Sequence, residues 1–206
     1  MLGAMYFLLR GTPFIYQGQE LGMTNFERKS IDEFNDISSI DQYYRSIQEG
    51  LSEEEALKVI NLRSRDNSRT PFPWNSSEYG GFSKVKPWLG MIENYKEINA
   101  EAQVGQDDSI YEFYKKMIDF RQNSIYSECL IYGNITAIDT ENDEVIAYTR
   151  KDGNETIYCY FNFSQNKVFE PLNIKSKKVI FNNLKEVDIS EDGIILKPNQ
   201  ALLITI

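Results

Sequence analysis

The spacing of hydrophobic residues changes near residue 124, and this change constrains the fold more than any other feature of the chain. Within residues 109–123, apolar side chains recur every three or four positions, which predicts one amphipathic helix. Beyond residue 124, apolar and polar residues alternate, and turn signals rich in Gly, Asp and Asn separate the alternating runs. These runs are residues 145–150, 156–163 and 201–206. We therefore expect a small antiparallel β domain over residues 127–206.

The residues before this point predict helices and a long loop. Ser52 and Glu55 have the spacing of a capping box at the start of a predicted helix over residues 52–62. Another helix is predicted over residues 41–50. Residues 63–108 are rich in Asn, Ser, Gly and Pro, and so long an irregular stretch is usually functional or disordered. Its aromatic residues favour a functional loop.

The first residues of the chain are strongly apolar. Residues 2–10 predict the tail of a buried helix that ends at Gly11. The short apolar run at residues 13–16 is typical of a strand that is buried on both faces.

The composition excludes several classes of site. The 206 residues include no histidine and two cysteines, Cys129 and Cys159, so the sequence excludes His-based metal sites, Ser-His-Asp triads and Cys-His dyads. The net charge of −9 argues against nucleic acid or an anionic membrane as a partner. No apolar run approaches the roughly 20 residues of a membrane span, and residues 1–10 lack the features of a signal peptide. We expect a cytoplasmic protein with free thiols, no cofactor and no metal.

Residues 64–75, with the sequence SRDNSRTPFPWN, place two arginines, a carboxylate and two aromatic rings beside prolines. Each arginine is a rigid fork of donors, and Phe72 and Trp74 offer flat apolar faces of the kind that the C–H surface of a sugar contacts. The alternative is a surface loop in which an Arg–Asp ion pair and two packed rings have only a structural role. Composition alone leaves both interpretations open.

Three motifs in order, at a family-like spacing, carry a resemblance. They are GTPFIYQGQELGMTN at residues 11–25, RDNSRTP at residues 65–71, and PW at residues 87–88 followed by NYKEIN at residues 94–99. With these motifs the chain resembles glycoside hydrolase family 13, in particular its oligo-1,6-glucosidase, dextran glucosidase and sucrose isomerase branch. The resemblance covers essentially the whole chain, including LKPNQAL at residues 196–202.

The resemblance implies an α/β barrel fragment, the end of a TIM barrel, followed by an all-β antiparallel sandwich domain. Residues 13–16 would be the eighth barrel strand, residues 17–108 the long loop after it, and residues 109–123 the eighth helix. Residues 1–126 would be an incomplete C-terminal part of the catalytic (β/α)8 barrel, and residues 127–206 the β-sandwich. A full barrel takes about 250 residues, so this chain can hold only the end of one.

The resemblance also implies that the catalytic residues lie elsewhere. In this family the nucleophile Asp, the acid/base Glu and a third Asp with its neighbouring His all precede the eighth strand. A retaining glycosidase needs two carboxyl groups about 5 to 5.5 Å apart. We therefore predict the C-terminal portion of a retaining α-glucosidase acting on α-1,6-linked oligosaccharides, with no catalytic residue in this chain and no activity by itself.

Three residues match substrate-binding positions of the family. Glu20 corresponds to a carboxylate that reaches the sugar on the leaving-group side. Arg69, and as a second choice Arg65, corresponds to the arginine that holds hydroxyls of the glucose at the non-reducing end. Gln19 stands where many relatives have Glu, so the match is incomplete there. We expect Asp66 to orient one of the arginines through a bidentate pair.

Other functions stay open. One is an autonomous carbohydrate-binding or interaction module without catalysis. Another is a fragment of a sucrose isomerase or a trehalose-6-phosphate hydrolase, which share the scaffold. The expected partners are an oligosaccharide and either the missing barrel segment or a second copy, because an unpaired strand and an apolar patch in residues 1–16 would drive association.

Overall fold

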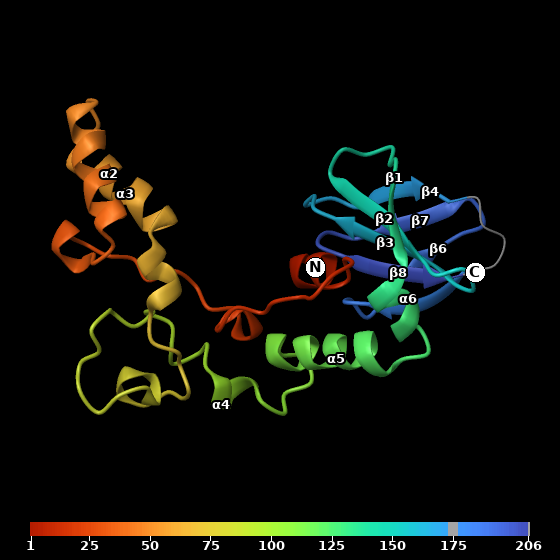
Figure 1. Cartoon of the computed structure of the whole chain (residues 1–206), viewed down its shortest axis with the longest axis horizontal. Helices are drawn as coiled ribbons and strands as arrows, with labels where there is room; N and C mark the ends of the chain where they lie inside the picture. The colour runs from red at the N-terminus through yellow and green to blue at the C-terminus, as the bar shows by residue number, and fades with distance from the viewer. Residues whose placement is uncertain (173–176, 206) are drawn as a thin grey trace. The chain divides into compact units, whose positions relative to one another are not determined.

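The computed structural model describes residues 1–172 and 177–205 of the chain (Figure 1). The chain divides into two compact units. The first unit combines residues 1–14 with residues 113–206, and the second unit consists of residues 15–112.

The first unit contains two antiparallel sheets (Figure 1). The larger sheet has the strand order β1-β2-β3-β8-β5 and the smaller has the order β4-β7-β6. The strands of the larger sheet are β1 (Asn134–Ile138), β2 (Val145–Lys151), β3 (Thr156–Asn162), β8 (Ala201–Thr205) and β5 (Lys178–Asn182). Those of the smaller sheet are β4 (Val168–Pro171), β7 (Gly193–Leu196) and β6 (Asp188–Ile189). The predicted antiparallel β domain is confirmed.

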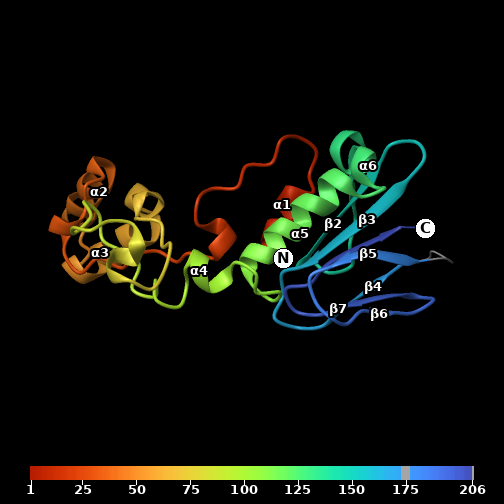
Figure 2. The same ribbon diagram turned by 90° about the horizontal axis from the view of Figure 1, so that it is seen from below.

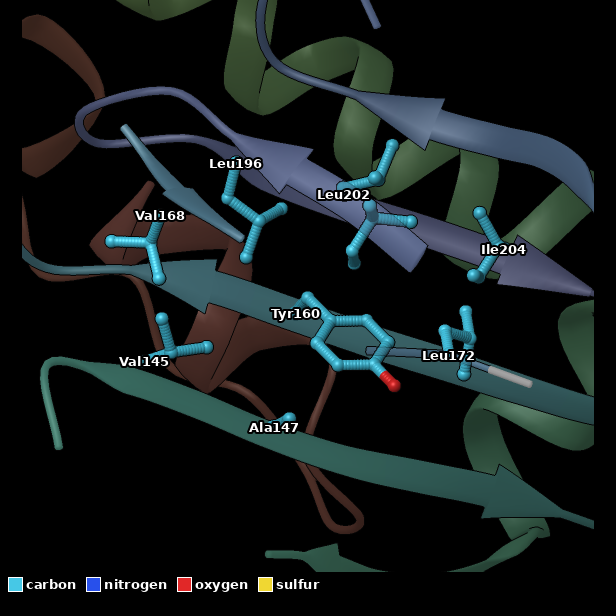
Figure 3. Packing of buried hydrophobic residues seen from close by; sticks show 9 residues of the cluster. Val145, Ala147, Tyr160, Val168, Leu172, Leu196, Leu202 and Ile204 are labelled. Carbon is cyan, nitrogen blue, oxygen red and sulfur yellow. The ribbon is translucent and has the colours of Figure 1, made fainter. Parts of the chain in front are cut away.

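The core of this domain lies between the two sheets (Figure 3). Strand β8 is buried along its whole length, and its Leu202 pairs with Tyr160 of β3. Leu202, Ile204 and Tyr160 share one hydrophobic cluster with Val168 of β4 and Leu196 of β7. Side chains from both sheets therefore pack against each other, which is the arrangement of a β-sandwich.

Helix α5 (Ile110–Asn123) confirms the predicted amphipathic helix. It presents the fully buried Met117 and two aromatic rings, Phe113 and Phe120. The ring of Phe181 in β5 lies 5.9 Å from the Phe113 ring and 5.5 Å from the Phe120 ring, between centroids. The helix therefore packs on the larger sheet through ring contacts.

Two short helices, α1 (Leu2–Phe7) and α6 (Ser127–Tyr132), complete the first unit. Helix α1 ends earlier than residue 10, where the apolar run predicts its end. Helix α6 was not predicted, because strands were expected from residue 127. Cys129 and Leu130 are buried there, and this tertiary burial favours a helical turn where the local pattern favours a strand.

Residues 13–16 do not form the expected strand. A strand is stabilised by hydrogen bonds to a neighbouring strand, and no strand of the described residues pairs with this run. The backbone N–H of Tyr16 instead donates to Oε1 of Gln19 at 2.8 Å, and Phe14 is 83% exposed.

The second unit is built around a hairpin of two helices, α2 (Ile37–Gln48) and α3 (Glu53–Arg63) (Figure 2). Both hydrogen bonds of the capping box between Ser52 and Glu55 are present, so α3 begins where the sequence predicts. Helix α2 begins at Ile37 rather than at residue 41. The core of the hairpin consists of Phe34, Tyr43, Ala56 and Ile60.

The rest of the second unit is irregular chain with short helical turns. These are the helix α4 (Ala100–Gln103) and the 3₁₀ turns Gln19–Leu21, Ile31–Glu33, Arg65–Arg69 and Glu78–Gly81. The predicted long loop is thus a chain of turns held by side chains, with a helical hairpin inserted in it.

Candidate functional site

A cleft of about 260 Å³ lies within the second unit, between residues 16–25 and residues 62–70. The two segments that line it are the two polar motifs that the sequence singled out. The hydroxyl of Tyr16 donates to the backbone carbonyl of Ser68 at 2.8 Å and so joins the segments. Its lining is mixed, with amide side chains such as Gln17 and Asn67, the charged Arg63 and the apolar Leu62. Glu20, Arg65 and Arg69 are not among the residues that line it.

Glu20 is held in a tight turn beside this cleft. Its Oε2 accepts a hydrogen bond from the backbone N–H of Gly18 at 2.7 Å. Gly18 and Gly22, which flank the 3₁₀ turn Gln19–Leu21, have φ angles of 92° and 68°. Such angles favour glycine, because a Cβ atom is strained there. The turn therefore fixes the direction of the Glu20 carboxylate.

Arg65 is anchored by Asp36, at the start of α2. Its Nε and Nη2 donate to Oδ1 of Asp36 at 3.1 and 2.7 Å. The Asp36 side chain is buried, whereas that of Arg65 is 65% exposed. The hydrogen bonds from Arg65 lower the pKa of Asp36 to about 2. The guanidinium of Arg65 is therefore held through Nε and Nη2, while the side chain stays largely exposed to solvent.

Arg69 is anchored by Asp66, at the other end of the same 3₁₀ turn. Its Nη1 donates to Oδ1 of Asp66 at 3.4 Å, and the Arg69 side chain is 39% exposed. Asp66 is fully buried, and its Oδ2 accepts the backbone N–H groups of Asn35 and Asp36 at 2.7 and 2.9 Å. The prediction that Asp66 forms a bidentate pair with an arginine is wrong. Only its Oδ1 accepts from Arg69, because the two backbone N–H groups occupy Oδ2.

Two of the three predicted residues share one short element. Arg65 and Arg69 lie at the two ends of one 3₁₀ turn, and each uses a buried carboxylate as its anchor. Glu20 lies on the other segment, and within the described residues no hydrogen bond joins it to either arginine. The substrate roles of all three residues stay predictions.

The aromatic pair of the loop is partly exposed. The rings of Phe72 and Trp74 lie 4.7 Å apart between centroids with a tilt of 59°. Trp74 is 56% exposed, and its backbone N–H is fixed by the carbonyl of Gly80 at 2.8 Å. The packing of one ring on the other agrees with the structural interpretation, and the exposed indole face is compatible with a sugar rim.

Two residues of this region were missed in the sequence. Asp36 could have been recognised as an N-cap before α2, since Asp is favoured at that position, but not as the partner of Arg65. Arg28 is buried between the rings of Phe26 and Phe34, with its Cζ 5.2 and 4.9 Å from their centroids. Its Nη1 donates to Oδ1 of Asn67 at 2.9 Å. Because Asn67 lies within the 3₁₀ turn Arg65–Arg69, this bond helps to hold the turn in place.

Neither a metal centre nor a membrane helix is found in the part of the chain that the structure describes. No group of three or more His, Cys, Asp or Glu side chains in residues 1–172 and 177–205 could hold a metal ion. No helix among the same residues is both long enough and apolar enough to cross a membrane.

Comparisons with known proteins agree with the motifs. Residues 1–133 match the family described as "Alpha amylase, catalytic domain", and residues 135–195 match "Maltogenic Amylase, C-terminal domain". The chain is 39% identical over 204 residues to the probable oligo-1,6-glucosidase 3 of Bacillus subtilis, a match that covers 97% of this chain and 36% of that protein.

Solved structures give the same result. The trehalose-6-phosphate hydrolase of Bacillus licheniformis superposes with a TM-score of 0.90 at 33% identity, and the isomaltulose synthase SmuA of Protaminobacter rubrum with 0.89 at 39%. Each match covers 99% of this chain and 37% of the solved chain, so the chain spans little more than a third of the length of these relatives. The helical end of a catalytic domain and the antiparallel domain after it are therefore common to all of them. The chain belongs to the α-amylase family, glycoside hydrolase family 13, and corresponds to the C-terminal part of enzymes in its oligo-1,6-glucosidase, isomaltulose synthase and trehalose-6-phosphate hydrolase branch.

Proposed function

We propose that this chain is the C-terminal portion of a retaining α-glucosidase that hydrolyses short α-1,6-linked oligosaccharides. The observation that carries the proposal is the 3₁₀ turn Arg65–Arg69, which presents two partly exposed guanidinium groups anchored by buried carboxylates. A guanidinium has five N–H donors, so one or two bonds to a carboxylate leave others for sugar hydroxyls. The α-1,6 linkage is supported by relatives named oligo-1,6-glucosidase.

In this proposal, Arg69 holds hydroxyls of the glucose at the non-reducing end, and Arg65 assists it. Glu20 meets the sugar on the leaving-group side, where its Oε1 can accept a hydroxyl while its Oε2 stays on Gly18. A fixed donor or acceptor contributes more to binding than a mobile one, because less side-chain entropy is lost when the sugar binds. The role of these residues is to bind and orient the sugar.

The catalytic step is assigned to residues outside this chain. Retention requires a nucleophilic carboxylate and an acid/base carboxyl group about 5 to 5.5 Å apart across the glycosidic bond. In the family these groups precede the motif at residues 11–25. We propose that the 206 residues by themselves do not hydrolyse glycosides.

The test compares two proteins, the full-length gene product and the 206-residue chain, on isomaltose, panose, sucrose and trehalose-6-phosphate. We expect the full-length protein to release glucose from isomaltose and panose, and the 206-residue chain to release none. Hydrolysis by the short chain would contradict the assignment of catalysis to other residues. Preference for sucrose or trehalose-6-phosphate would favour the other members of the branch.

The binding role of Arg69 is tested in the full-length protein with Arg69→Met. Loss of a charged hydrogen-bond donor to the sugar should lower kcat/KM by about 10- to 100-fold. Arg10→Met is the matched control. Arg10 is an exposed arginine that donates to Asn134, and both residues belong to the first unit, whereas Arg69 belongs to the second. Equal kcat/KM values for the two variants would remove Arg69 from the binding site.

The second candidate function is an autonomous carbohydrate-binding module, which the partly exposed Trp74 and the intact β-sandwich favour. Both functions allow the 206 residues to bind isomaltose, and the module differs in predicting that the surrounding gene encodes no further barrel strands. Reading the coding sequence upstream of Met1 for an Asn-His-Asp-type motif separates the two functions.

Two further proposals concern partners and location. We propose that residues 1–16 associate with the rest of a catalytic barrel or with a second copy, because Leu2 and Phe14 are large exposed apolar side chains there. Sedimentation equilibrium of the 206-residue chain, compared with a Phe14→Ser variant, measures the self-association.

We also propose a cytoplasmic location, which is supported by Cys129 and Cys159 being free thiols.

A further inference from the structure

We propose that Asp66 is a positioning residue that sets the direction of both arginines of the sugar site through one buried carboxylate. The inference rests on the proposed function, in which Arg65 and Arg69 hold the glucose. It assigns a role to a residue that touches neither the sugar nor the reacting atoms.

The carboxylate of Asp66 is a junction between two chain segments. It is fully buried, and its own backbone N–H donates to Oγ of Ser64 at 3.2 Å, which starts the 3₁₀ turn Arg65–Arg69. Its two oxygens point to different partners. Oδ1 faces Arg69 on the same turn, and Oδ2 faces residues 35 and 36 on the segment before α2.

The first branch reaches Arg69 directly. Nη1 of Arg69 lies 3.4 Å from Oδ1 of Asp66, in an i,i+3 pair across the turn. This bond is long, so Asp66 fixes the guanidinium mainly by charge. Because Asp66 is removed from water, that attraction is screened less than it would be at the surface.

The second branch reaches Arg65 through Asp36. Oδ2 of Asp66 accepts the backbone N–H of Asp36 at 2.9 Å and so places that residue. Oδ1 of Asp36 then accepts both Nε and Nη2 of Arg65, while its Oδ2 accepts the hydroxyl of Ser39 at 2.8 Å. The low pKa of Asp36 shows that it is ionised in this pair. Arg65 is thus held by a carboxylate whose backbone is held by Asp66.

The two branches explain why a carboxylate is needed at position 66. An aspartate offers two acceptor oxygens and a negative charge, whereas asparagine offers one oxygen and an N–H₂ group. In Asp66→Asn the single oxygen can still accept the N–H groups of Asn35 and Asp36, but a neutral amide oxygen holds them more weakly than a carboxylate does, which loosens the Arg65 branch. The N–H₂ group then faces Arg69, where it repels the guanidinium.

The experiment measures isomaltose binding by NMR titration of the 206-residue chain. We expect Asp66→Asn to weaken binding about tenfold, by loss of a charge-assisted contact to Arg69. In an Arg69→Met background the same substitution should weaken binding by a smaller factor, about threefold, because only the Arg65 branch is left. An unchanged affinity of Asp66→Asn, or an equal factor in both backgrounds, would overturn the proposal.

The matched control is Asp152→Asn in the first unit. Oδ1 of Asp152 also accepts two backbone N–H groups, those of Asn154 and Glu155, both at 2.9 Å. This variant should bind isomaltose as the wild type does. A loss of binding equal to that of Asp66→Asn would show a general effect of losing a turn carboxylate, against the proposal.

A second readout is independent of sugar binding. The hydrogen-bonded Nε–H of Arg65 should exchange with water about threefold faster in Asp66→Asn, where the backbone of Asp36 is held more weakly. It should exchange faster still in Asp36→Asn, where the group that accepts the Nε–H loses its charge. If the wild-type chain binds no isomaltose, and Arg69→Met is fully active in the full-length protein, the proposed function fails. The Nε–H exchange rates then still decide the role of Asp66, and equal rates in all three proteins would refute it.

Circular dichroism at each step checks that the variants are folded, and Asp36→Asn replaces Asp66→Asn if the latter unfolds.

Discussion

Arg121 and Arg150 donate hydrogen bonds to the same oxygen, the backbone carbonyl of Leu130, at 3.1 and 2.7 Å. Both side chains are buried in the first unit. Arg121 also donates to the carbonyls of Phe7, Leu9 and Gly11, and Arg150 to those of Leu8 and Gly133.

The carbonyls of Phe7 and Leu8 lie at the C-terminal end of α1, those of Leu130 and Gly133 at that of α6, and those of Leu9 and Gly11 in the chain after α1. The carbonyls at a helix C-terminus have no partners within the helix. The partial negative charge of a helix C-terminus favours a cation there. Burial lowers the pKa of both guanidinium groups, and the charge of Arg150 lowers that of Arg121 further. The pair therefore fastens the first residues of the chain to the β-sandwich domain.

The first prediction concerns Arg150. Replacing it by Met leaves three buried carbonyl oxygens without this donor, so we expect the free energy of unfolding to fall by about 3 to 5 kcal/mol. Arg10→Met, which removes an exposed arginine, should change it by less than about 0.5 kcal/mol. Urea denaturation followed by circular dichroism measures both, and equal midpoints would refute the assignment.

The second prediction concerns the pH dependence of the second unit. The folded pKa of Asp36 is lowered from 3.8 to about 2, so the stability from this group is present above pH 3.8 and is lost as pH falls toward 2. Arg65 is largely exposed and solvent screens the pair, so the effect should not exceed about 1 kcal/mol. Trp74 and Trp88 are the two tryptophans of the chain and both lie in this unit, so their fluorescence reports its unfolding. The stability difference between wild type and Asp36→Asn should shrink over this range, and a constant difference would contradict the ion pair.

The third prediction concerns Glu170 of β4, a buried carboxyl group. Its Oε2 accepts the backbone N–H of Glu141 at 3.2 Å, and its Oε1 has no hydrogen-bond partner in the described structure. Burial raises its pKa above 4.5, so stability is greatest below pH 4.5 and falls as pH rises through the raised pKa. Glu170→Gln should therefore be more stable than wild type by about 1 kcal/mol near neutral pH, and equal to it in acid. The exposed Glu144→Gln is the control, and a pH-independent effect of Glu170→Gln in thermal melts would exclude titration as the cause.

The fourth prediction concerns the turn that holds Glu20. Gly18 has a φ of +92°, and an added Cβ would collide with Sδ of Met23, so Gly18→Ala should lower the free energy of unfolding by about 1 to 3 kcal/mol. Gly50 has a φ of +104° with nothing near its Cβ position. Gly50→Ala therefore has backbone strain without the collision. Tryptophan fluorescence in urea should show the larger loss for Gly18→Ala, and the reverse order would contradict the close approach of Met23 to this turn.

Local patterns predicted the elements that local interactions stabilise. Helix α3 begins at its capping box because Ser52 and Glu55 satisfy each other's backbone N–H groups without help from the rest of the chain. The strands of the β domain follow from alternation, since one face of each must be buried. Helix α6 was missed because strands were expected from residue 127, and burial of Cys129 and Leu130 decided its conformation.

The candidate site likewise contains residues that a local motif predicts and residues that only the structure reveals. Arg65 and Arg69 were found from their motif, and they lie at the two ends of one short 3₁₀ turn. Their anchors could not be found in this way. Asp36 lies 29 positions from Arg65 along the chain, and the second oxygen of Asp66 is occupied by N–H groups 30 and 31 positions away.

The sequence by itself determined the family, the order of a helical part and a β-sandwich, and the identity of the polar turn, because motifs and hydrophobic periods are properties of neighbouring residues. Only the tertiary structure decided which carboxylate holds which arginine, that residues 13–16 have no strand partner among the described residues, and that Arg121 and Arg150 cap two helices. These features depend on contacts between residues far apart in the chain. Such contacts form only where folding brings buried charges and unpaired backbone groups together. Each group then needs a hydrogen-bond partner, because a buried polar group without one costs free energy.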